Sequence, residues 1–156
     1  MQTAATFPSP KDMLPHRPPM LLIDRVVAHE PGSSITVGTD ILPDNPFFEG
    51  HFPGEPILPG IVLIEMMFQA CGIYGRMEAL TQLPTEKAAA WRPKSGRAIK
   101  IENASFSKPV LPNDRLIIHV RHKHRIMQFS TFDASVTIEG RGVAAKGVVT
   151  VLINND

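Results

Sequence analysis

The fold is decided by the stretch ILPGIVLIEMMFQACGIYGRMEAL at residues 57–80, the most apolar part of the chain. It is long enough to raise the question of a membrane span, but Glu65, Gln69 and Arg76 interrupt it and glycines weaken it. Pro84 marks its end. The pattern therefore predicts a buried helix, and a helix that is apolar nearly all round must be covered on most sides.

Short β-branched or aliphatic runs lie on both sides of this helix. Residues 20–28 and 34–42 precede it, with a Glu-Pro-Gly turn between them, and predict a strand pair. Further strand-like runs follow at residues 97–106, 115–125, 127–140 and 142–154. This order predicts an α+β fold in which an antiparallel sheet wraps around one long central helix.

The chain length suits one domain. Its 156 residues, 43% of them hydrophobic, can fill one sizeable core. We assign that domain to residues 14–156 and treat residues 1–13 as an N-terminal extension. A loop is predicted at residues 81–96, where the composition changes around the single tryptophan.

Charge and cysteine content indicate which partners and which cellular compartment the chain is suited to. Lys and Arg total 16 against 15 for Asp and Glu, so the chain has no broad basic field for nucleic acid. Cys71, the only cysteine, lies in the apolar run and is predicted to be a buried core residue, which favours a reducing compartment. The first residues do not look like a secretory signal, so the cytoplasm is the expected location.

His51 is the first candidate for chemistry. It lies between Gly50 and a Phe-Pro-Gly sequence, where proline fixes the backbone and glycine allows unusual dihedrals. A histidine held on such a loop can act as a base near neutral pH. Taken alone, a structural histidine that caps a turn is the commoner interpretation.

Glu65 is the second candidate. Apolar residues flank it on both sides, so its carboxyl is predicted to be buried, protonated and able to donate a proton to a leaving group. Gln69 follows at i+4, where its amide can orient that carboxyl. The alternative is that Glu65 and Gln69 form a hydrogen-bonded polar stripe on the helix, for example at a subunit interface. The residues alone favour neither interpretation.

A base and an acid close together suit the elimination of water next to a carbonyl group. One group removes a proton from the carbon beside the carbonyl, and the other protonates the departing hydroxyl. A thioester makes that carbon acidic enough. The backbone N–H of Gly60, at the positive end of the helix, can stabilise the thioester oxygen.

Several motifs together resemble one family. They are GHFPGEPILPGIVLIEMMFQA at residues 50–70, LPHRP at 14–18, LLIDRV at 21–26 and FxKPVxPxD at 106–114. From Leu14 to about Leu152 the chain resembles the FabZ-type 3-hydroxyacyl-acyl-carrier-protein dehydratases. The resemblance implies a hot-dog fold and a homodimer in which His51 of one subunit faces Glu65 of the other.

The same resemblance implies a role for each matching residue. His51 and Glu65 correspond to the catalytic pair, Gln69 to the residue that hydrogen-bonds the carboxylate, and Gly60 to the thioester-binding amide. The implied partner is acyl carrier protein, with no cofactor beyond its phosphopantetheine arm. The related FabA-type enzymes, which also isomerise the double bond, carry aspartate at the Glu65 position, so glutamate favours dehydration alone.

The acyl tunnel is the part where this chain departs from the family. Residues 97–102, RAIKIE, replace the usual segment with an aromatic gate. We expect Trp91 to serve as a hydrophobic anchor or as a substitute gating ring, and a specialised polyketide or polyene substrate is an alternative to a fatty acid. The residues expected to line the tunnel or contact the substrate are Phe52, Pro59, Phe68 and Trp91.

Two further clusters contain basic residues and histidines. Arg92, Lys94, Arg97 and Lys100 form a positive patch that can meet an acidic carrier protein, with an ordinary solvated loop as the alternative. His119, His122 and His124 raise the question of a metal. Only the last two share a face of a regular strand, and no carboxylate or thiol at suitable spacing completes a site, so no metal is expected.

Three other functions remain open at this stage. A hot-dog thioesterase and a coenzyme A hydratase are the enzymatic alternatives, since the same carboxylate can activate water. A non-catalytic subunit that pairs with another hot-dog protein comes from a different class. Higher oligomers, including hexamers, are compatible with the sequence, and no membrane span is expected.

Overall fold

The computed structural model describes residues 6–153, and its centre is one sheet. Six antiparallel strands follow the order β1-β2-β4-β5-β6-β3. The strands are β1 (Arg25–Glu30), β2 (Ser34–Asp40), β3 (Gly96–Phe106), β4 (Arg115–Ile126), β5 (Phe129–Ile138) and β6 (Gly142–Ile153).

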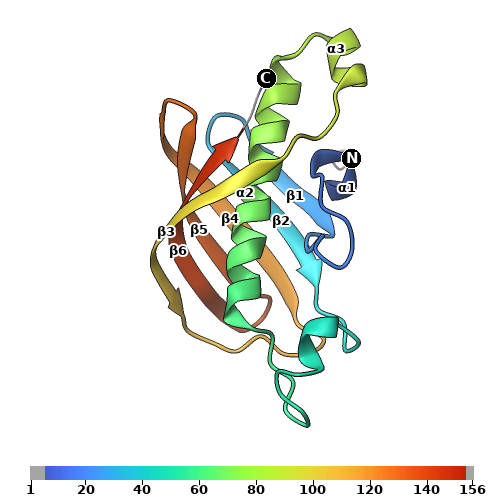
Figure 1. Cartoon of the computed structure of the whole chain (residues 1–156), viewed down its shortest axis with the longest axis vertical. Coiled ribbons are helices and arrows are strands. Elements are labelled where there is room, and N and C mark those ends of the chain that lie inside the picture. Colours follow the sequence, from blue (N-terminus) through green and yellow to red (C-terminus); the bar gives the residue numbers. More distant parts are fainter. Residues whose placement is uncertain (1–5, 154–156) are drawn as a thin grey trace.

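The long helix α2 (Gly60–Gln82) runs along one face of the curved sheet (Figure 1). Alternate residues of β4, namely Leu116, Ile118 and Val120, are fully buried, as expected for a strand with one face on the core. Met66 and Met67 of α2 are at most 1% exposed. The predicted α+β fold with a sheet around a central helix is confirmed.

Two short helices adjoin this core. In α1 (Pro10–Met13), Met13 is fully buried and the helix contacts α2, so the end of the predicted extension joins the core. Leu14 lies so close to α2 that a Cβ atom on Gly72 would be 3.0 Å from its Cδ2 atom. The 3-10 helix η1 (Pro46–Phe48) precedes the loop that carries His51.

The loop predicted at residues 81–96 is wrong at residues 81–82, at residues 85–90 and at Gly96, where β3 begins. Helix α2 continues to Gln82, and α3 (Thr85–Ala90) begins directly after Pro84. Three alanines and a lysine in α3 are strong helix formers, and proline is well suited to the start of a helix. Residues 91–95 remain a loop.

The first strand begins at Arg25, later than predicted, because the backbone before it has another partner. The amide of Gln69 hydrogen-bonds the backbone of Met20 and Leu22, and these groups therefore do not pair with a neighbouring strand. At the other end of the chain, residue 154 of the last predicted strand lies outside the described residues.

Strand β3 forms one edge of the sheet, and all eleven of its residues are exposed. They include Ile99 at 48%, Ile101 at 39% and Phe106 at 54% exposure. An edge strand with exposed apolar side chains is able to pair with another chain. Between residues 6 and 153, no helix is long and apolar enough to cross a membrane.

Candidate active site

His51 is held by its own loop. Its backbone N–H donates to the Phe48 carbonyl at 3.2 Å, and its carbonyl accepts from Ile57 N at 2.9 Å. The ring stacks on Phe52, with the ring centroids 4.1 Å apart. Ring orientation is therefore fixed by local contacts, as the glycine-proline sequence predicts.

The same loop sets the proton distribution on the ring. Nδ1 lies 2.8 Å from the carbonyl oxygen of Ile57. Because a carbonyl can only accept, Nδ1 carries the hydrogen and the neutral ring keeps its lone pair on Nε2. Nε2 is thus the basic atom of His51.

His51 lines a largely apolar cavity of about 760 Å³ together with the start of α2 and the end of β3. Gly60, the first residue of α2, shares this cavity, and Pro59 is the N-cap of the helix. A Cβ atom on Gly60 would lie 2.8 Å from Cε1 of Phe106, so only glycine fits there without moving the ring. The N–H of Gly60 belongs to the first turn of α2, where the helix itself supplies no acceptor.

Glu65 lies on α2 and contacts Gln69, as the i+4 spacing predicts. Gln69 Nε2 donates to Glu65 Oε1 at 2.9 Å and to the Met20 carbonyl at 2.7 Å. Its own Oε1 accepts from Leu22 N at 3.0 Å. These contacts fix which end of the amide faces Glu65, because Leu22 requires the oxygen and Met20 the nitrogen.

The burial predicted for Glu65 is only partial. Its side chain is 32% exposed in this chain, whereas Met66 and Met67 next to it face the sheet and are buried. Glu65 instead points along the opposite side of α2, into space bounded by residues near the N-terminus and by β3. Gln69, at 2% exposure, is the buried member of the pair.

His16 also lies beside Glu65, a contact that the local sequence does not predict. Its Nε2 is 3.6 Å from Glu65 Oε1, close enough for an ion pair when the ring is protonated. Its Nδ1 is buried and has no hydrogen-bond partner among the described residues. The LPHRP motif was the available signal, but nothing local connects it with a helix so far along the chain.

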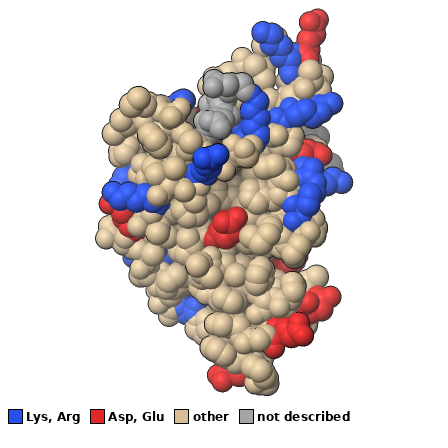
Figure 2. All heavy atoms as spheres, in the orientation of Figure 1, with Lys and Arg blue, Asp and Glu red and all other residues tan. Residues whose placement is uncertain are grey.

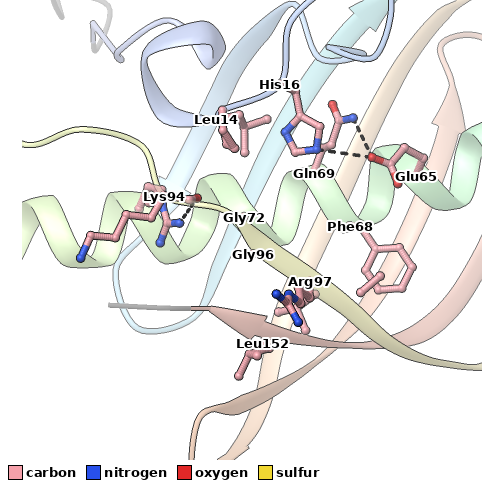
Figure 3. Close-up of a pocket in the computed structure, with 14 residues that line it drawn as sticks. Leu14, His16, Glu65, Phe68, Gln69, Gly72, Lys94, Gly96, Arg97 and Leu152 are labelled. Carbon is pink, nitrogen blue, oxygen red and sulfur yellow. Dashed lines mark hydrogen bonds and ion pairs between the residues drawn. The ribbon is translucent and has the colours of Figure 1, made fainter. Parts of the chain in front are cut away.

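Glu65, His16 and Gln69 line one end of a cavity of about 220 Å³ (Figure 3). Its walls come from the segment before β1, from α2 and from the paired ends of β3 and β6. Phe68 lines this cavity and a second one that it shares with Glu65 and Ala98. The structure thus places His51 and Glu65 in different cavities of the single chain.

Two of the aromatic residues predicted to contact the substrate, Phe52 and Trp91, do not line the two cavities beside His51 and Glu65. Phe52 is 49% exposed and contacts His51. Trp91 follows α3, and the guanidinium carbon of Arg76 lies 5.8 Å from its ring centroid. Its contact with Arg76 fits the anchoring role, and a gating role stays a prediction.

The predicted positive patch is exposed, and its four members have different neighbours. Lys100 pairs with Glu102 at 3.1 Å, and Arg92 donates to the Trp91 carbonyl. Lys94 and Arg97 line the cavity that contains Glu65. Figure 2 shows Lys and Arg gathered in the upper half of this face, around α3 and the start of β3.

The three histidines of β4 do not form a metal site. The strand register shifts between His122 and His124, so the regular alternation assumed for this pair does not hold. His119 Nδ1 lies 3.0 Å from Thr36 Oγ1, and His122 stacks on Tyr74. Across residues 6–153 no group of three potential metal ligands comes together.

Solved structures show the fold class. A chain of the ApeI:P dehydratase heterocomplex from Xenorhabdus doucetiae is similar with a TM-score of 0.78 and 20% identity, covering 97% of this chain and 94% of that one. A hypothetical thioesterase with coenzyme A from Streptococcus pneumoniae TIGR4 has a TM-score of 0.59 and 16% identity, covering 83% and 84%. These similarities and the sheet around α2 define a hot-dog fold.

Sequence comparisons show the family. Residues 14–146 match the FabA-like domain. The 3-hydroxyacyl-[acyl-carrier-protein] dehydratase FabZ of Anaeromyxobacter sp. (strain Fw109-5) is 35% identical over 144 residues, covering 92% of this chain and 87% of the relative. The FabZ protein of Ehrlichia chaffeensis is 37% identical and covers 92% of both chains. The chain therefore belongs to the FabA-like family, among its FabZ members, which confirms the resemblance found in the sequence.

Proposed function

We propose that this protein dehydrates 3-hydroxyacyl thioesters on acyl carrier protein to trans-2-enoyl thioesters, in fatty-acid or related polyketide biosynthesis. The proposal is supported mainly by a base and a carboxyl group that hydrogen bonds hold in a defined orientation, in a chain of this family. His51 presents a basic Nε2 because Nδ1 donates to Ile57, and Glu65 has its carboxyl oriented by Gln69.

In the proposed reaction His51 Nε2 removes the proton from the carbon next to the thioester carbonyl. The electron pair moves toward the carbonyl, and the Gly60 N–H stabilises the oxygen as it gains charge. Glu65, as the carboxylic acid, protonates the hydroxyl at the next carbon; the electron pair then forms the double bond between the two carbons as the carbon–oxygen bond breaks and water leaves. The elimination is redox-neutral, so no electron-accepting cofactor is required.

The active site is proposed to form between two copies of the chain. Two observations support this arrangement: His51 and Glu65 lie in different cavities, and β3 offers an exposed edge with apolar side chains. Pairing of two β3 edges would cover those side chains and bring a second chain to the cavities. It would also cover Glu65, whose side chain is 32% exposed in one chain. An isologous dimer of this kind contains two equivalent sites.

Purified protein is expected to convert 3-hydroxyacyl-carrier substrates to conjugated enoyl products, whose absorbance reports the reaction. The assay should include several acyl lengths, because the tunnel sequence departs from the family. Release of a free thiol without enoyl product would identify a thioesterase instead. Absence of dehydration at every length, with the protein folded and dimeric, would contradict the proposal.

Reversing the charge of Arg97 and Lys100 to glutamate is expected to raise KM for a carrier-bound substrate about tenfold and to affect a pantetheine substrate less. Both side chains are exposed, and exposed charges mainly steer the encounter with an oppositely charged partner. The difference should shrink at high salt. Equal losses on both substrates would show that the patch does not meet the carrier.

We also propose a reducing, cytoplasmic location. The supporting observation is Cys71, which is fully buried on α2 and is not part of a disulfide. Burial raises the pKa of its thiol well above the usual value, so it is held in the unreactive form. This agrees with its predicted place in the core.

A further inference from the structure

His16 is held beside Glu65 by the packing of the residues that precede it. Met13 is fully buried, and Leu14 packs so closely on α2 that Gly72 has no room for a side chain beneath it. The segment is thus anchored to the helix two residues before His16. Figure 3 shows the His16 ring on the α2 side of this segment, directed toward Glu65.

The backbone around His16 is also fixed. Arg17 Nη1 donates to the Leu14 carbonyl at 3.0 Å and to the His16 carbonyl at 2.6 Å. Four residues after His16, the Met20 carbonyl accepts from Gln69 Nε2 of α2 at 2.7 Å. Hydrogen bonds and packing on both sides therefore determine where the ring lies, and its contact with Glu65 is not needed to hold it there.

The ring of His16 has one polar contact within residues 6–153. Its Nε2 lies 3.6 Å from Glu65 Oε1, and its buried Nδ1 has no hydrogen-bond partner. A carboxylate oxygen can only accept, so a lone pair on Nε2 would repel it, and a hydrogen on Nδ1 would be a buried donor without an acceptor. The neutral ring therefore carries its hydrogen on Nε2. This is the opposite of His51, whose Nδ1 donates to the Ile57 carbonyl.

Two donors face the same oxygen of Glu65 (Figure 3). Gln69 Nε2 donates to Oε1 at 2.9 Å, and His16 Nε2 is directed at that atom as well. Within the described part of the chain, no hydrogen bond or ion pair reaches Oε2. A proton on Oε1 would meet two other donors, so the acidic proton of Glu65 belongs on Oε2.

We propose that His16 is a positioning residue for Glu65: its Nε2–H keeps the acidic proton on Oε2 and stabilises Oε1 as the carboxylate forms. The inference rests on the proposed function, in which Glu65 protonates the departing hydroxyl. As the proton leaves Oε2, negative charge spreads over both oxygens, and donors already in place at Oε1 lower the barrier. The contact is longer than a hydrogen bond in the free chain, and contacts of this kind tighten in the transition state.

Replacing His16 by leucine is expected to lower kcat by about 10- to 100-fold, the usual effect of a hydrogen bond to a charged group, with little change in KM. His16→Gln should restore most of the rate, because its amide N–H reaches about as far from the backbone as Nε2. His16→Asn should not, since the shorter amide ends near the place of Nδ1. His124→Leu, the same change at an exposed position of β4, should keep the wild-type rate.

A double variant separates an effect through Glu65 from a direct contact with the substrate. In Glu65→Gln no carboxylate forms, so adding His16→Leu should not lower the residual rate further. A further loss as large as that of His16→Leu alone would overturn the inference. A loss in KM alone, or a rate as low in His16→Gln as in His16→Leu, would do the same. Thermal unfolding and light scattering establish that each variant is folded and has the wild-type oligomeric size.

A measurement without turnover separates this inference from the proposed function. Nitrogen NMR of labelled histidine distinguishes the ring nitrogen that carries hydrogen from the one that does not. His16 should carry it on Nε2 and His51 on Nδ1, and His16→Gln assigns the His16 signal by its loss. Hydrogen on Nδ1 of His16 would overturn the inference even in an active dehydratase. Hydrogen on Nε2 in a protein that dehydrates no substrate would support the contact with Glu65 and contradict the proposed function.

Discussion

Replacing Glu65 by glutamine is expected to lower kcat for dehydration by about 10²–10⁴-fold, the usual contribution of a general acid. Glutamine has nearly the same shape, and its carbonyl oxygen can still accept from Gln69 Nε2. The contacts of Gln69 with Met20 and Leu22 are therefore retained. The substitution removes the acidic proton and little else, and absorbance of the enoyl product measures the loss.

The matched control is Glu86→Gln, the same change at an exposed position of α3. It should keep wild-type activity, and both variants should keep the wild-type oligomeric size in light scattering. The expected effect is on kcat and kcat/KM together, because the proton is donated only in the transition state. If Glu65→Gln retains full activity, Glu65 is a polar residue of the helix surface and the proposed acid must be another group.

The sequence is sufficient to predict the framework of the site because its signals are local. A Pro-Gly pair opens α2, Pro84 follows its end, and the unbroken apolar run between them needs cover on most sides. The i+4 spacing alone predicts that Gln69 reaches Glu65, and the structure confirms this contact. The conformation of the His51 loop likewise depends on neighbouring residues.

The remaining features depend on contacts between distant segments. Gln69 binds the backbone of Met20 and Leu22 and keeps these two residues out of the first strand, and no local pattern predicts that contact. His16 reaches Glu65 only because the segment after α1 crosses α2. Arg76 contacts the loop before β3 through the Lys94 carbonyl. The composition of that loop indicates a loop but does not predict its path.

Replacing His51 by alanine is expected to reduce dehydration by about 10²–10⁴-fold or more, because no base then remains to take the proton next to the carbonyl. The loop should survive, since its backbone bonds to Phe48 and Ile57 do not involve the ring. Phe52→Leu provides a comparison, because it removes the ring stacked on His51 and keeps the base. A smaller loss is expected there. Wild-type activity in His51→Ala would exclude the residue as the base.

Mixing the two inactive variants tests the shared site directly. In a dimer of one His51→Ala chain and one Glu65→Gln chain, one site keeps both His51 and Glu65 and the other site has neither. Random exchange of equal amounts places half of the chains in such dimers, so activity should return to about a quarter of the wild-type value. A double variant, mixed with wild type under the same exchange, cannot form an additional intact site and serves as the control. If His51 and Glu65 of the same chain act together, no combination of the two single variants can restore a site, and the mixture stays inactive.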